Sequence, residues 1–432
     1  MFGFSMIKLV RQHADKLDLH MRSKLVNLYR PMRKVPCFLH SSIEKWLKKR
    51  NKMKVLIEFH EEEANVLGAT QVHELIASHR KCKVHHQFGS IPFCSATLTA
   101  NAVEDLLTNC THIKKIHYDR EVKALLDKAS PSIHADVLNQ SGVTGKDITI
   151  AIVDTGIYPH SDIKDRIIGF QDFVNQKSQA YDDNGHGTHC AGDAAGNGYL
   201  SDGKYRGPAP EANLVGVKVL NKMGSGSLST VIAGVQWCID NKEEYNIKVI
   251  SMSLGSSATQ PAADDPVVKA VEKAWQVGIV VCVAAGNEGP DDNTVSSPGI
   301  SSKIITVGAI DDQNTLDRSD DKIASFSSRG PTIDGITKPD ILTPGVNIVS
   351  LRSPGSYLDK ASKDSRVAND YFSLSGTSMA TPICAGVAAL VLEQNPDFTP
   401  DQVKEKLISA AEDWGLPANS QGHGYLDVSK LI

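Results

Sequence analysis

The stretch DDNGHGTHCAGDAAG (residues 182–196) places two histidines, His186 and His189, beside Cys190 among many glycines. These residue types suit two kinds of chemistry: all three could bind a metal, or one histidine could be a general base with small neighbours. A structural zinc site needs about four ligands, and a zinc protease motif has a glutamate between its histidines. The chain has neither that glutamate nor a C-x-x-C pair. The sequence therefore favours a general base.

A catalytic histidine needs a carboxylate that orients it and a nucleophile that it deprotonates. AIVDTG places Asp154 at the end of an apolar run, and SGTSMATP places Ser375, Thr377 and Ser378 just before a long apolar helix. A serine at a helix start lies beside backbone N–H groups and the positive end of the helix dipole, which suit a developing oxyanion. VAAGNEG offers Asn287, an amide donor, after another apolar run. Each residue alone also suits a cap or a turn, but together their order predicts a serine hydrolase site.

The elements that must position these residues alternate between strands and helices. Near-continuous apolar runs separated by helical stretches predict an α/β fold, a doubly wound parallel sheet with helices on both faces. Functional residues of such sheets lie at the carboxyl ends of strands, where Asp154, Ser253 and Asn287 stand. The expected strands are residues 148–156, 213–220, 247–255, 278–287 and 304–310, and the expected helices are 187–195, 228–243 and 265–278.

The segments VDTGI, GHGTHCAG, AAGNEG and SGTSMATP resemble the four signature segments of the subtilisin-like serine proteases, and the resemblance runs from about residue 142 to 432. It implies that Ser378 is the nucleophile, that His186 is the general base and acid, and that Asp154 orients the imidazole. The Asn287 amide and the Ser378 backbone N–H would form the oxyanion hole, and His189 would be structural. The chain looks most similar to the intracellular alkaline serine proteases of bacilli. A serine endopeptidase with peptide or protein substrates and no catalytic cofactor is therefore expected.

The resemblance also implies a substrate cleft in which two strand segments clamp an extended peptide through backbone hydrogen bonds. Gly185 and Gly187 would keep bulk away from the substrate beside the general base. The residues implied for the clamp are Gly224, Ser225, Gly226, Ser253, Leu254 and Gly255. The pocket for the fourth residue before the cut would consist of Leu228, Val231 and Leu254. The primary pocket would consist of Ala284, Ala285, Gly286 and Ser296.

Two segments of this region depart from the family pattern. Residues 196–207 replace the asparagine-rich calcium loop of secreted relatives, although Asp162 matches one of the ligands. Structural calcium is thus possible but not supported at the usual high-affinity loop, and no metal ligand is assigned. The segment RSPGSYLDKASKDSRVANDY (residues 352–371) is longer than usual, and either borders the cleft or is a surface insertion.

Residues 53–126 form a separate unit in the sequence pattern. Their expected order of elements, β-α-β-β-α-β, predicts a small ferredoxin-like α+β fold. In order and position the unit resembles a subtilase propeptide, which templates folding and then inhibits the enzyme from within the same chain. The chain would thus consist of a basic extension (1–52), a propeptide (53–126) and a catalytic domain (127–432). Cleavage is expected near residues 122–130, with Leu125 or Leu126 in the primary pocket.

Composition sets the broad class and the compartment. The 432 residues are 41% hydrophobic and 22% charged, which is typical of a globular chain with a large core. The net charge of −4 hides a basic N-terminus, because residues 1–53 hold 13 Lys and Arg against 3 Asp and Glu. Such an arm can bind nucleic acid or an anionic membrane, but a helix resting on the acidic remainder is the simpler interpretation, so a nucleic-acid partner is not expected.

No secretory signal and no run of about 18 apolar residues is visible, so no membrane span is expected. The eight cysteines are scattered, and several lie in apolar stretches, which is typical of buried free thiols. These features predict a cytoplasmic protein.

Other functions remain open at this point. A catalytically idle subtilase fold, its cleft permanently occupied by residues 53–126, would be a binding protein. An acid-active relative of the sedolisin type would use glutamate as its base, which His186 and Asn287 disfavour. Since all four catalytic groups are present, the sequence favours an endopeptidase made as a self-processing zymogen.

Overall fold

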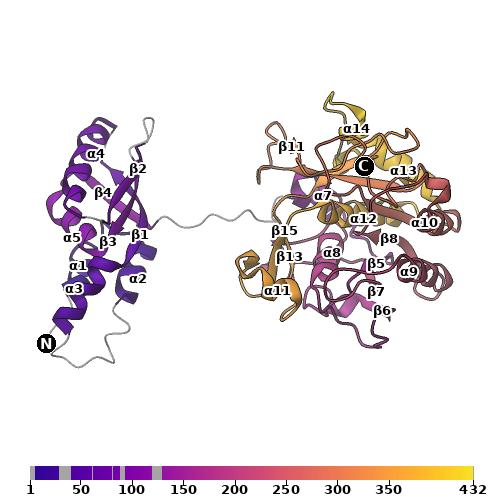
Figure 1. Ribbon diagram of the computed structural model, residues 1–432, viewed down its shortest axis with the longest axis horizontal. Helices are drawn as coiled ribbons and strands as arrows, with labels where there is room; N and C mark the ends of the chain where they lie inside the picture. Colours follow the sequence, from indigo (N-terminus) through magenta and orange to yellow (C-terminus); the bar gives the residue numbers. More distant parts are fainter. Residues whose placement is uncertain are drawn as a thin grey trace. The chain divides into compact units, whose positions relative to one another are not determined.

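The computed structural model describes residues 5–28, 40–60, 62–79, 81–87, 93–118 and 129–431. The chain divides into two compact units, residues 1–123 and 124–432 (Figure 1). Each unit has a hydrophobic core of its own. The domain boundary predicted after residue 126 lies outside the described residues. Among the described residues, no helix is both long and apolar enough to cross a membrane.

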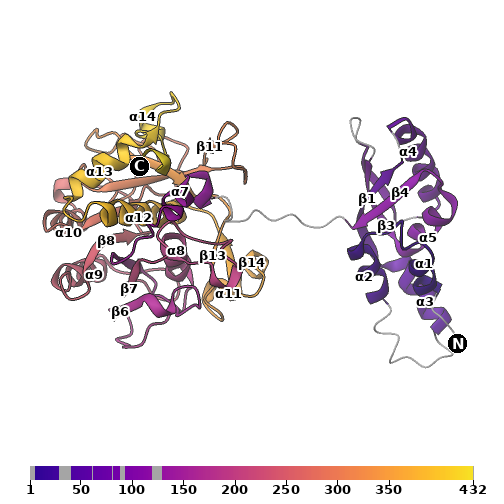
Figure 2. The ribbon, with the colours of Figure 1, turned by 180° about the vertical axis from the view of Figure 1, so that it is seen from behind.

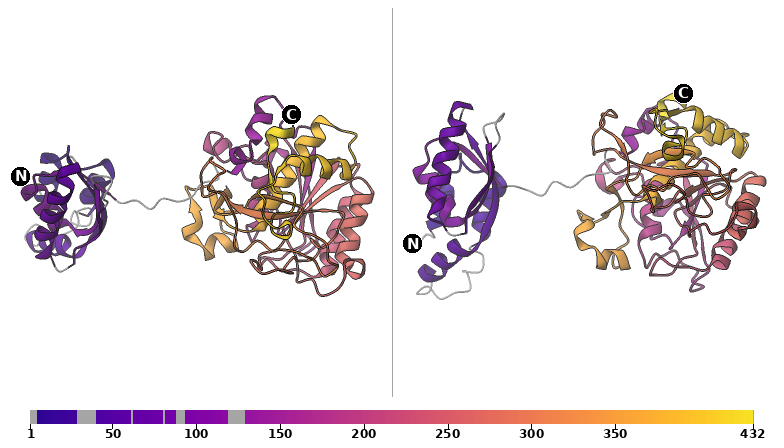
Figure 3. Two further views of the ribbon diagram at one scale, coloured as in Figure 1. Left: turned by 90° about the horizontal axis from the view of Figure 1, so that it is seen from above. Right: turned by 45° about the horizontal axis from the view of Figure 1, so that its top comes forward.

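The smaller unit contains the predicted β-α-β-β-α-β order. Its four strands form one antiparallel sheet in the order β2-β3-β1-β4, and α4 and α5 pack beside each other against it (Figure 3). Strand β1 forms because its apolar residues alternate, which buries Met53, Val55, Ile57 and Phe59 on one face. The elements are β1 (Lys52–Phe59), α4 (Glu62–Ala77), β2 (Lys83–Gln87), β3 (Phe93–Thr99), α5 (Ala100–Asn109) and β4 (Ile113–Tyr118).

The basic N-terminal segment differs from the prediction of an extension resting on the acidic remainder of the chain. Its helices, α1 (Ser5–Gln12), α2 (Leu19–Asn27) and α3 (His40–Arg50), belong to the smaller unit. Leu17, Met21 and Leu25 are fully buried in the same core as the sheet. Lys48 of α3 forms an ion pair with Glu104 of α5 at 2.6 Å. Met21 and Leu25 lie four residues apart on α2 and give this charged segment an apolar helical face, and Leu17 is buried just before the helix.

The larger unit is built on a mostly parallel sheet, as predicted. Its order is β16-β17-β12-β10-β9-β8-β5-β7-β6, with β11 paired to β10. The strands are β5 (Thr149–Asp154), β6 (Ile167–Asp172), β7 (Asn213–Lys218), β8 (Ile247–Met252), β9 (Val280–Ala284), β10 (Ile305–Asp311), β11 (Lys322–Ile323), β12 (Ile341–Pro344), β16 (Ala411–Glu412) and β17 (Tyr425–Leu426), and a separate small sheet joins β13 (Ile348–Leu351), β15 (Tyr371–Leu374) and β14 (Arg366–Val367).

Helices cover this sheet. Helix α8 packs on α12, which also contacts β8, β9 and β10, while α9 and α10 pack on each other (Figure 2). The helices are α6 (Ala129–Ser132), α7 (Ala135–Gln140), α8 (His186–Ala195), α9 (Leu228–Asp240), α10 (Pro266–Gln276), α11 (Tyr357–Ala361), α12 (Thr377–Gln394), α13 (Pro400–Ser409) and α14 (Ala418–Gln421).

Strand β5 lies where the strand order reverses. The next strands along the chain, β6 and β7, lie on one side of it, and β8, β9 and β10 follow on the other. Ligands of open α/β sheets bind outside the carboxyl ends of the strands at such a switch point. The last residue of β5 is Asp154, so the topology alone places this carboxylate at the expected binding position.

Candidate active site

Asp154 and His186 are joined directly. Asp154 ends β5, His186 begins α8, and the Asp154 Oδ1 and His186 Nδ1 atoms lie 2.8 Å apart. The Thr155 backbone N–H donates to the same Oδ1 at 2.7 Å. The other oxygen, Oδ2, is buried without a hydrogen-bond partner in the described part of the chain. Among the described residues, the Asp154 carboxylate is thus held by the Thr155 N–H and His186, both at Oδ1.

The surroundings of His186 alter its acidity. Burial by itself lowers the pKa of His186, but the nearby Asp154 carboxylate, the Cys190 side chain and the hydrogen bond to Asp154 raise it well above 6.5. The Cys190 Sγ lies 3.8 Å from Nδ1. The imidazole keeps an exposed edge, with 22% of its side chain accessible. It can therefore accept a proton at the cleft, and does so best when alkaline pH leaves it neutral.

A buried carboxylate supports the loop before His186. Asp182 accepts hydrogen bonds from the Thr155 hydroxyl, the Gly185 N–H and both donors of Thr188, at 2.7–2.9 Å. It thereby links the end of β5 to the start of α8. This arrangement fixes both catalytic segments relative to each other.

The two glycines that flank His186 have a different explanation from the one predicted. A Cβ on Gly187 would lie 2.2 Å from the Gly156 carbonyl oxygen, so this glycine allows α8 to approach the turn after β5. Gly185 has φ +106°, and its Cβ would lie 2.8 Å from the Ser356 Oγ. Both glycines are required by packing within the protein, and the prediction that they make room for substrate was wrong.

His189 is structural, as the family resemblance implied. Its Nδ1 lies 2.9 Å from the buried Asp193 carboxylate. Its Nε2 lies 3.1 Å from the Ile348 and 3.0 Å from the Phe372 carbonyl oxygens. Both nitrogens are thus engaged, and His189 cannot share a metal with His186.

One group of potential metal ligands occurs among the described residues: Asp154, His186 and Cys190, whose ligand atoms lie within 4.8 Å of one another. Three ligands are fewer than a structural zinc site uses, and the first two already bind each other. The arrangement fits an Asp–His pair better than a metal centre.

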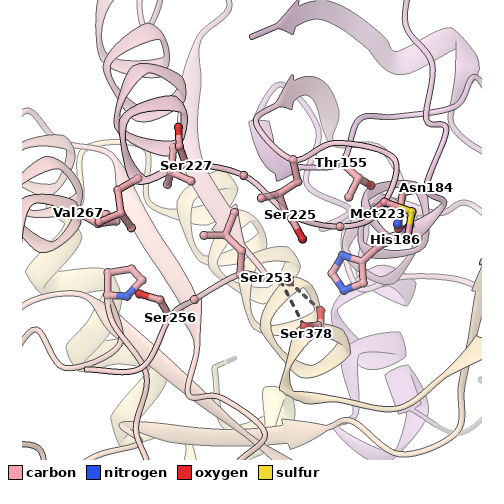
Figure 4. Close-up of a pocket in the computed structure, with 18 of the residues that line it drawn as sticks. Thr155, Asn184, His186, Met223, Ser225, Ser227, Ser253, Ser256, Val267 and Ser378 are labelled. Carbon is pink, nitrogen blue, oxygen red and sulfur yellow. Dashed lines mark hydrogen bonds between the residues drawn. The ribbon is translucent and has the colours of Figure 1, made fainter. Parts of the chain in front are cut away.

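Ser378 is the second residue of α12 and lines the same cleft as His186 (Figure 4). Its hydroxyl donates to the Ser253 carbonyl oxygen at 3.3 Å rather than to His186. The Ser378 carbonyl accepts from the Ser253 hydroxyl at 2.7 Å and the Cys190 thiol at 3.5 Å. These contacts hold the first turn of α12 against the end of β8 and against α8.

Asn287 is oriented as an amide donor. Its Oδ1 accepts from the Thr377 N–H at 2.9 Å and the Thr377 hydroxyl at 3.1 Å, which leaves Nδ2 as the donor at the other end. A Cβ on Gly376 would lie 3.5 Å from Asn287 Nδ2 and 3.6 Å from the Ser378 backbone nitrogen. The two N–H donors therefore flank one small space, which suits an oxyanion.

A cleft of about 570 Å³ runs past Ser378. Figure 4 shows Ser225 and Ser253 on two chain segments of this cleft, with His186 facing Ser378. The predicted residues that line it are Gly224, Ser225, Gly226, Leu228, Val231, Ser253, Leu254 and Gly255.

The predicted primary pocket is a separate group that does not line this cavity. Ala284 and Ala285 are buried at the end of β9. A Cβ on Gly286 would lie 2.6 Å from the Ser296 Oγ, so Ser296 lies next to Gly286 as expected. The Ser296 N–H also donates to the Ala285 carbonyl oxygen at 2.9 Å.

Sequence reasoning missed several lining residues. Tyr357 and Leu358 come from the long segment 352–371, and their position confirms the expected alternative in which this segment borders the cleft. Its length was the only signal, and it did not identify these two residues. The complete set of additional residues is Thr155, Asn184, Leu220, Met223, Ser227, Ser256, Val267, Ser297, Pro298, Tyr357 and Leu358.

Protein donors contact both carboxylate oxygens of Asp162. One oxygen accepts from the Leu200 N–H at 3.1 Å, and the other accepts from the Tyr371 hydroxyl at 2.8 Å.

Comparison with known proteins decides the family. The Subtilase family pattern matches residues 145–425, which include Asp154, His186, Asn287 and Ser378. Serine protease AprX of Bacillus subtilis (strain 168) is 56% identical over 422 residues, which cover 96% of this chain and 95% of that protein. The chain belongs to the subtilase family. This subtilase is a serine endopeptidase.

Further relatives agree with this assignment. Subtilisin E of Bacillus subtilis (strain 168) is 35% identical to the subtilase over 343 residues, covering 78% of this chain and 80% of that one. The crystal structure of a cold adapted subtilisin-like serine proteinase matches with a TM-score of 0.50 and 32% identity, over 66% of this chain and 88% of that chain. The subtilisin-like fold predicted from the sequence is thereby confirmed.

Proposed function

We propose that Ser378, His186 and Asp154 form the catalytic triad of this endopeptidase. The observation that carries the proposal is the 2.8 Å contact between Asp154 and the His186 Nδ1, which leaves Nε2 for Ser378 at the cleft. His186 Nε2 takes the proton as the Ser378 Oγ bonds to the substrate carbonyl carbon, and Asp154 stabilises the resulting imidazolium. The Asn287 Nδ2 and the Ser378 N–H stabilise the oxyanion.

Two half-reactions follow from these roles. His186 gives its proton to the leaving amine as the peptide bond breaks, and an acyl-enzyme on Ser378 remains. A water molecule then attacks the ester carbonyl while His186 takes the water's proton. That proton returns to the Ser378 oxygen as the carboxylic product leaves.

We propose that the substrate lies extended between residues 224–226 and 253–255. The position of both segments along the cleft that His186 and Ser378 line supports this role. Leu228, Val231 and Leu254 supply an apolar end of the cleft for the fourth residue before the cut. Ala284, Ala285 and Gly286, with Ser296, would wall the primary pocket.

We propose that the enzyme is made as a zymogen whose first unit is a propeptide and intramolecular inhibitor. The division into two units with separate cores supports this, because a cut near residues 122–130 leaves both cores intact. We expect Leu125 or Leu126 to precede the cut. Sequencing of the mature N-terminus tests this, and a start before Ile113 contradicts it.

We further propose that catalysis needs no cofactor, and that the protein works in the cytoplasm. The seven cysteines in the described residues are free, which suits a reducing compartment. Cell fractionation with antibodies against the catalytic unit tests the location.

The experiment that tests the catalytic proposal compares the wild type with Ser378→Ala. The wild type should separate into two pieces on a denaturing gel and hydrolyse a chromogenic peptide at alkaline pH. The variant should stay whole and inert. If Ser378→Ala still processes itself and cleaves the peptide, the nucleophile is assigned incorrectly. If the wild type hydrolyses the peptide but stays whole, only the zymogen proposal fails.

A further inference from the structure

The segment 352–371 connects two strands of the small sheet, and its shape is fixed by an ion-pair network. It leaves the end of β13 and returns at the start of β15. Asp359, only 4% exposed in its side chain, binds the Nε atoms of Arg352 and Arg366, each at 2.6 Å. It also accepts from the Gly355 N–H at 2.8 Å. One carboxylate thus cross-links both ends of the segment, which fixes its shape.

Backbone hydrogen bonds attach this segment to the loop that carries the catalytic histidine. The Tyr357 N–H donates to the Asp183 carbonyl oxygen at 2.9 Å, and the Leu358 N–H donates to the Asn184 carbonyl oxygen at 3.0 Å. The Ser353 hydroxyl donates to the Asp182 carbonyl oxygen at 2.7 Å. The contact of Ser356 with Gly185 completes the match between the two segments.

This attachment brings two side chains into the substrate cleft. Tyr357 and Leu358 line it together with Asn184, His186 and Leu220. Tyr357 is 42% exposed, although it is a large ring in a folded segment. Rings of this size usually bury more of their surface, so Tyr357 offers contact area to a bound peptide.

Strand geometry says which substrate residue meets this wall. In an extended peptide, alternate side chains point to the same side, ~7 Å apart. The apolar end at Leu228, Val231 and Leu254 lines the same cavity as Tyr357 and Leu358, whereas Ala284, Ala285 and Gly286 do not. If the fourth residue before the cut enters the apolar end at Leu228, Val231 and Leu254, the side chain of the second residue before the cut points to the same side of the peptide. This second residue lies two positions nearer to Ser378.

We propose that Tyr357 and Leu358 select a large apolar side chain at the second position before the cut. They enclose it with Leu220 and the imidazole edge of His186. The inference rests on the proposed triad and on the proposed direction of the peptide, and it makes the long segment a specificity element of this enzyme.

The test measures kcat/KM on chromogenic peptides that differ only at this second position, which is Gly, Leu, Phe or Lys. The wild type should prefer Leu and Phe to Gly by at least about tenfold, since apolar pocket contacts have effects of that size. Tyr357→Ala and Leu358→Ala should each lose most of this preference, because the rate should fall far more on the Leu and Phe peptides than on the Gly peptide. Tyr199→Ala, which removes a 71% exposed tyrosine outside the cleft, should behave as the wild type.

A variant that gains a new substrate preference distinguishes a change in specificity from a loss of folding. Tyr357→Glu should raise the ratio of the Lys to the Leu peptide by about tenfold, because a carboxylate at the wall would pair with the ammonium group. Unchanged ratios in active variants, or an equal loss on every peptide including Gly, would overturn the inference while the triad stands. A wild type that cleaves none of the peptides would overturn the proposed function and this inference with it.

Discussion

Asp359→Asn is the substitution whose effect the structure lets us calculate. Although partial burial would raise the pKa of Asp359, hydrogen bonds from Arg352, Gly355 and Arg366 outweigh it and lower the pKa from 3.8 to about 2. At 1.36 kcal/mol per pKa unit, this shift corresponds to about 2 kcal/mol before screening. The two arginines keep 16% and 32% of their side chains exposed. Because solvent and salt screen such pairs, we expect about 1–2 kcal/mol in solution.

The sign of the pH effect follows from the direction of the shift. A carboxylate with a lowered folded pKa stabilises the structure above its unfolded pKa of 3.8. That contribution disappears as the pH falls toward 2. Asp359→Asn should therefore weaken the attachment of segment 352–371 at pH 7, and its difference from the parent should shrink as the pH falls below about 4.

Hydrogen exchange of the Tyr357 and Leu358 amides reports on this attachment, since both donate to the loop before His186. In a Ser378→Ala parent, which we expect not to degrade itself, Asp359→Asn should speed their exchange about 5–30-fold at pH 7. Asp292→Asn, at an exposed position, is the matched control. Equal exchange in Asp359→Asn and the parent at pH 7 would refute the reasoning that this carboxylate holds the segment in place.

Three further outcomes are expected. Asn287→Ala should lower kcat by ~10²–10³ with little change in KM, which is the effect of removing the corresponding amide in subtilisin, the type case. An unchanged kcat would remove Asn287 from the oxyanion hole. Because neutral His186 is the active form and its pKa is raised, kcat/KM should fall with decreasing pH along a limb centred above pH 6.5. Asp154→Asn should move that limb to lower pH and also slow the reaction. A limb centred below pH 6.5 in the wild type would contradict the pairing of Asp154 with His186. Gly185→Ala should lower the free energy of unfolding of the Ser378→Ala protein in urea by about 1–3 kcal/mol, because Gly185 has a left-handed φ and its Cβ would contact Ser356. Adding Ser356→Gly should restore only the part of the loss that comes from this contact. Full restoration would mean that the left-handed φ contributes nothing to the loss.

The sequence predicted those features that depend on local pattern. Apolar runs located β5, β7, β8, β9 and β10 to within a few residues, because buried parallel strands are apolar on both faces. The same pattern placed Asp154 at a strand end, and the sheet order confirms that this end is the switch point. The signature segments supplied the residues that the fold brings to one cleft.

Features that depend on contacts between distant segments were not predictable. The environment of His189 is completed by carbonyl groups of Ile348 and Phe372, more than 150 residues away in the chain. The position of Tyr357 beside His186 depends on backbone hydrogen bonds, which leave no trace in residue type. For the same reason Gly185 was assigned to substrate access when its neighbour is Ser356.

The basic N-terminal segment was misjudged for another reason. Its charges dominated the interpretation, while the apolar residues Leu17, Met21 and Leu25 recur at a helical spacing that was available in the sequence. Only the structure identifies their partner, which is the sheet of the smaller unit.

The backbone of this N-terminal segment also meets the sheet at its margin. β4 is an outer strand of the order β2-β3-β1-β4. Leu17 bridges to Ile116 on it, with the Asp18 N–H donating to the Ile116 carbonyl and the Ile116 N–H to the Lys16 carbonyl. Unpaired edge strands are templates for aggregation. A smaller unit that lacks residues 5–28 would therefore expose both an apolar surface and an unpaired edge strand. The intact segment covers this edge, so the unit should not associate with copies of itself there.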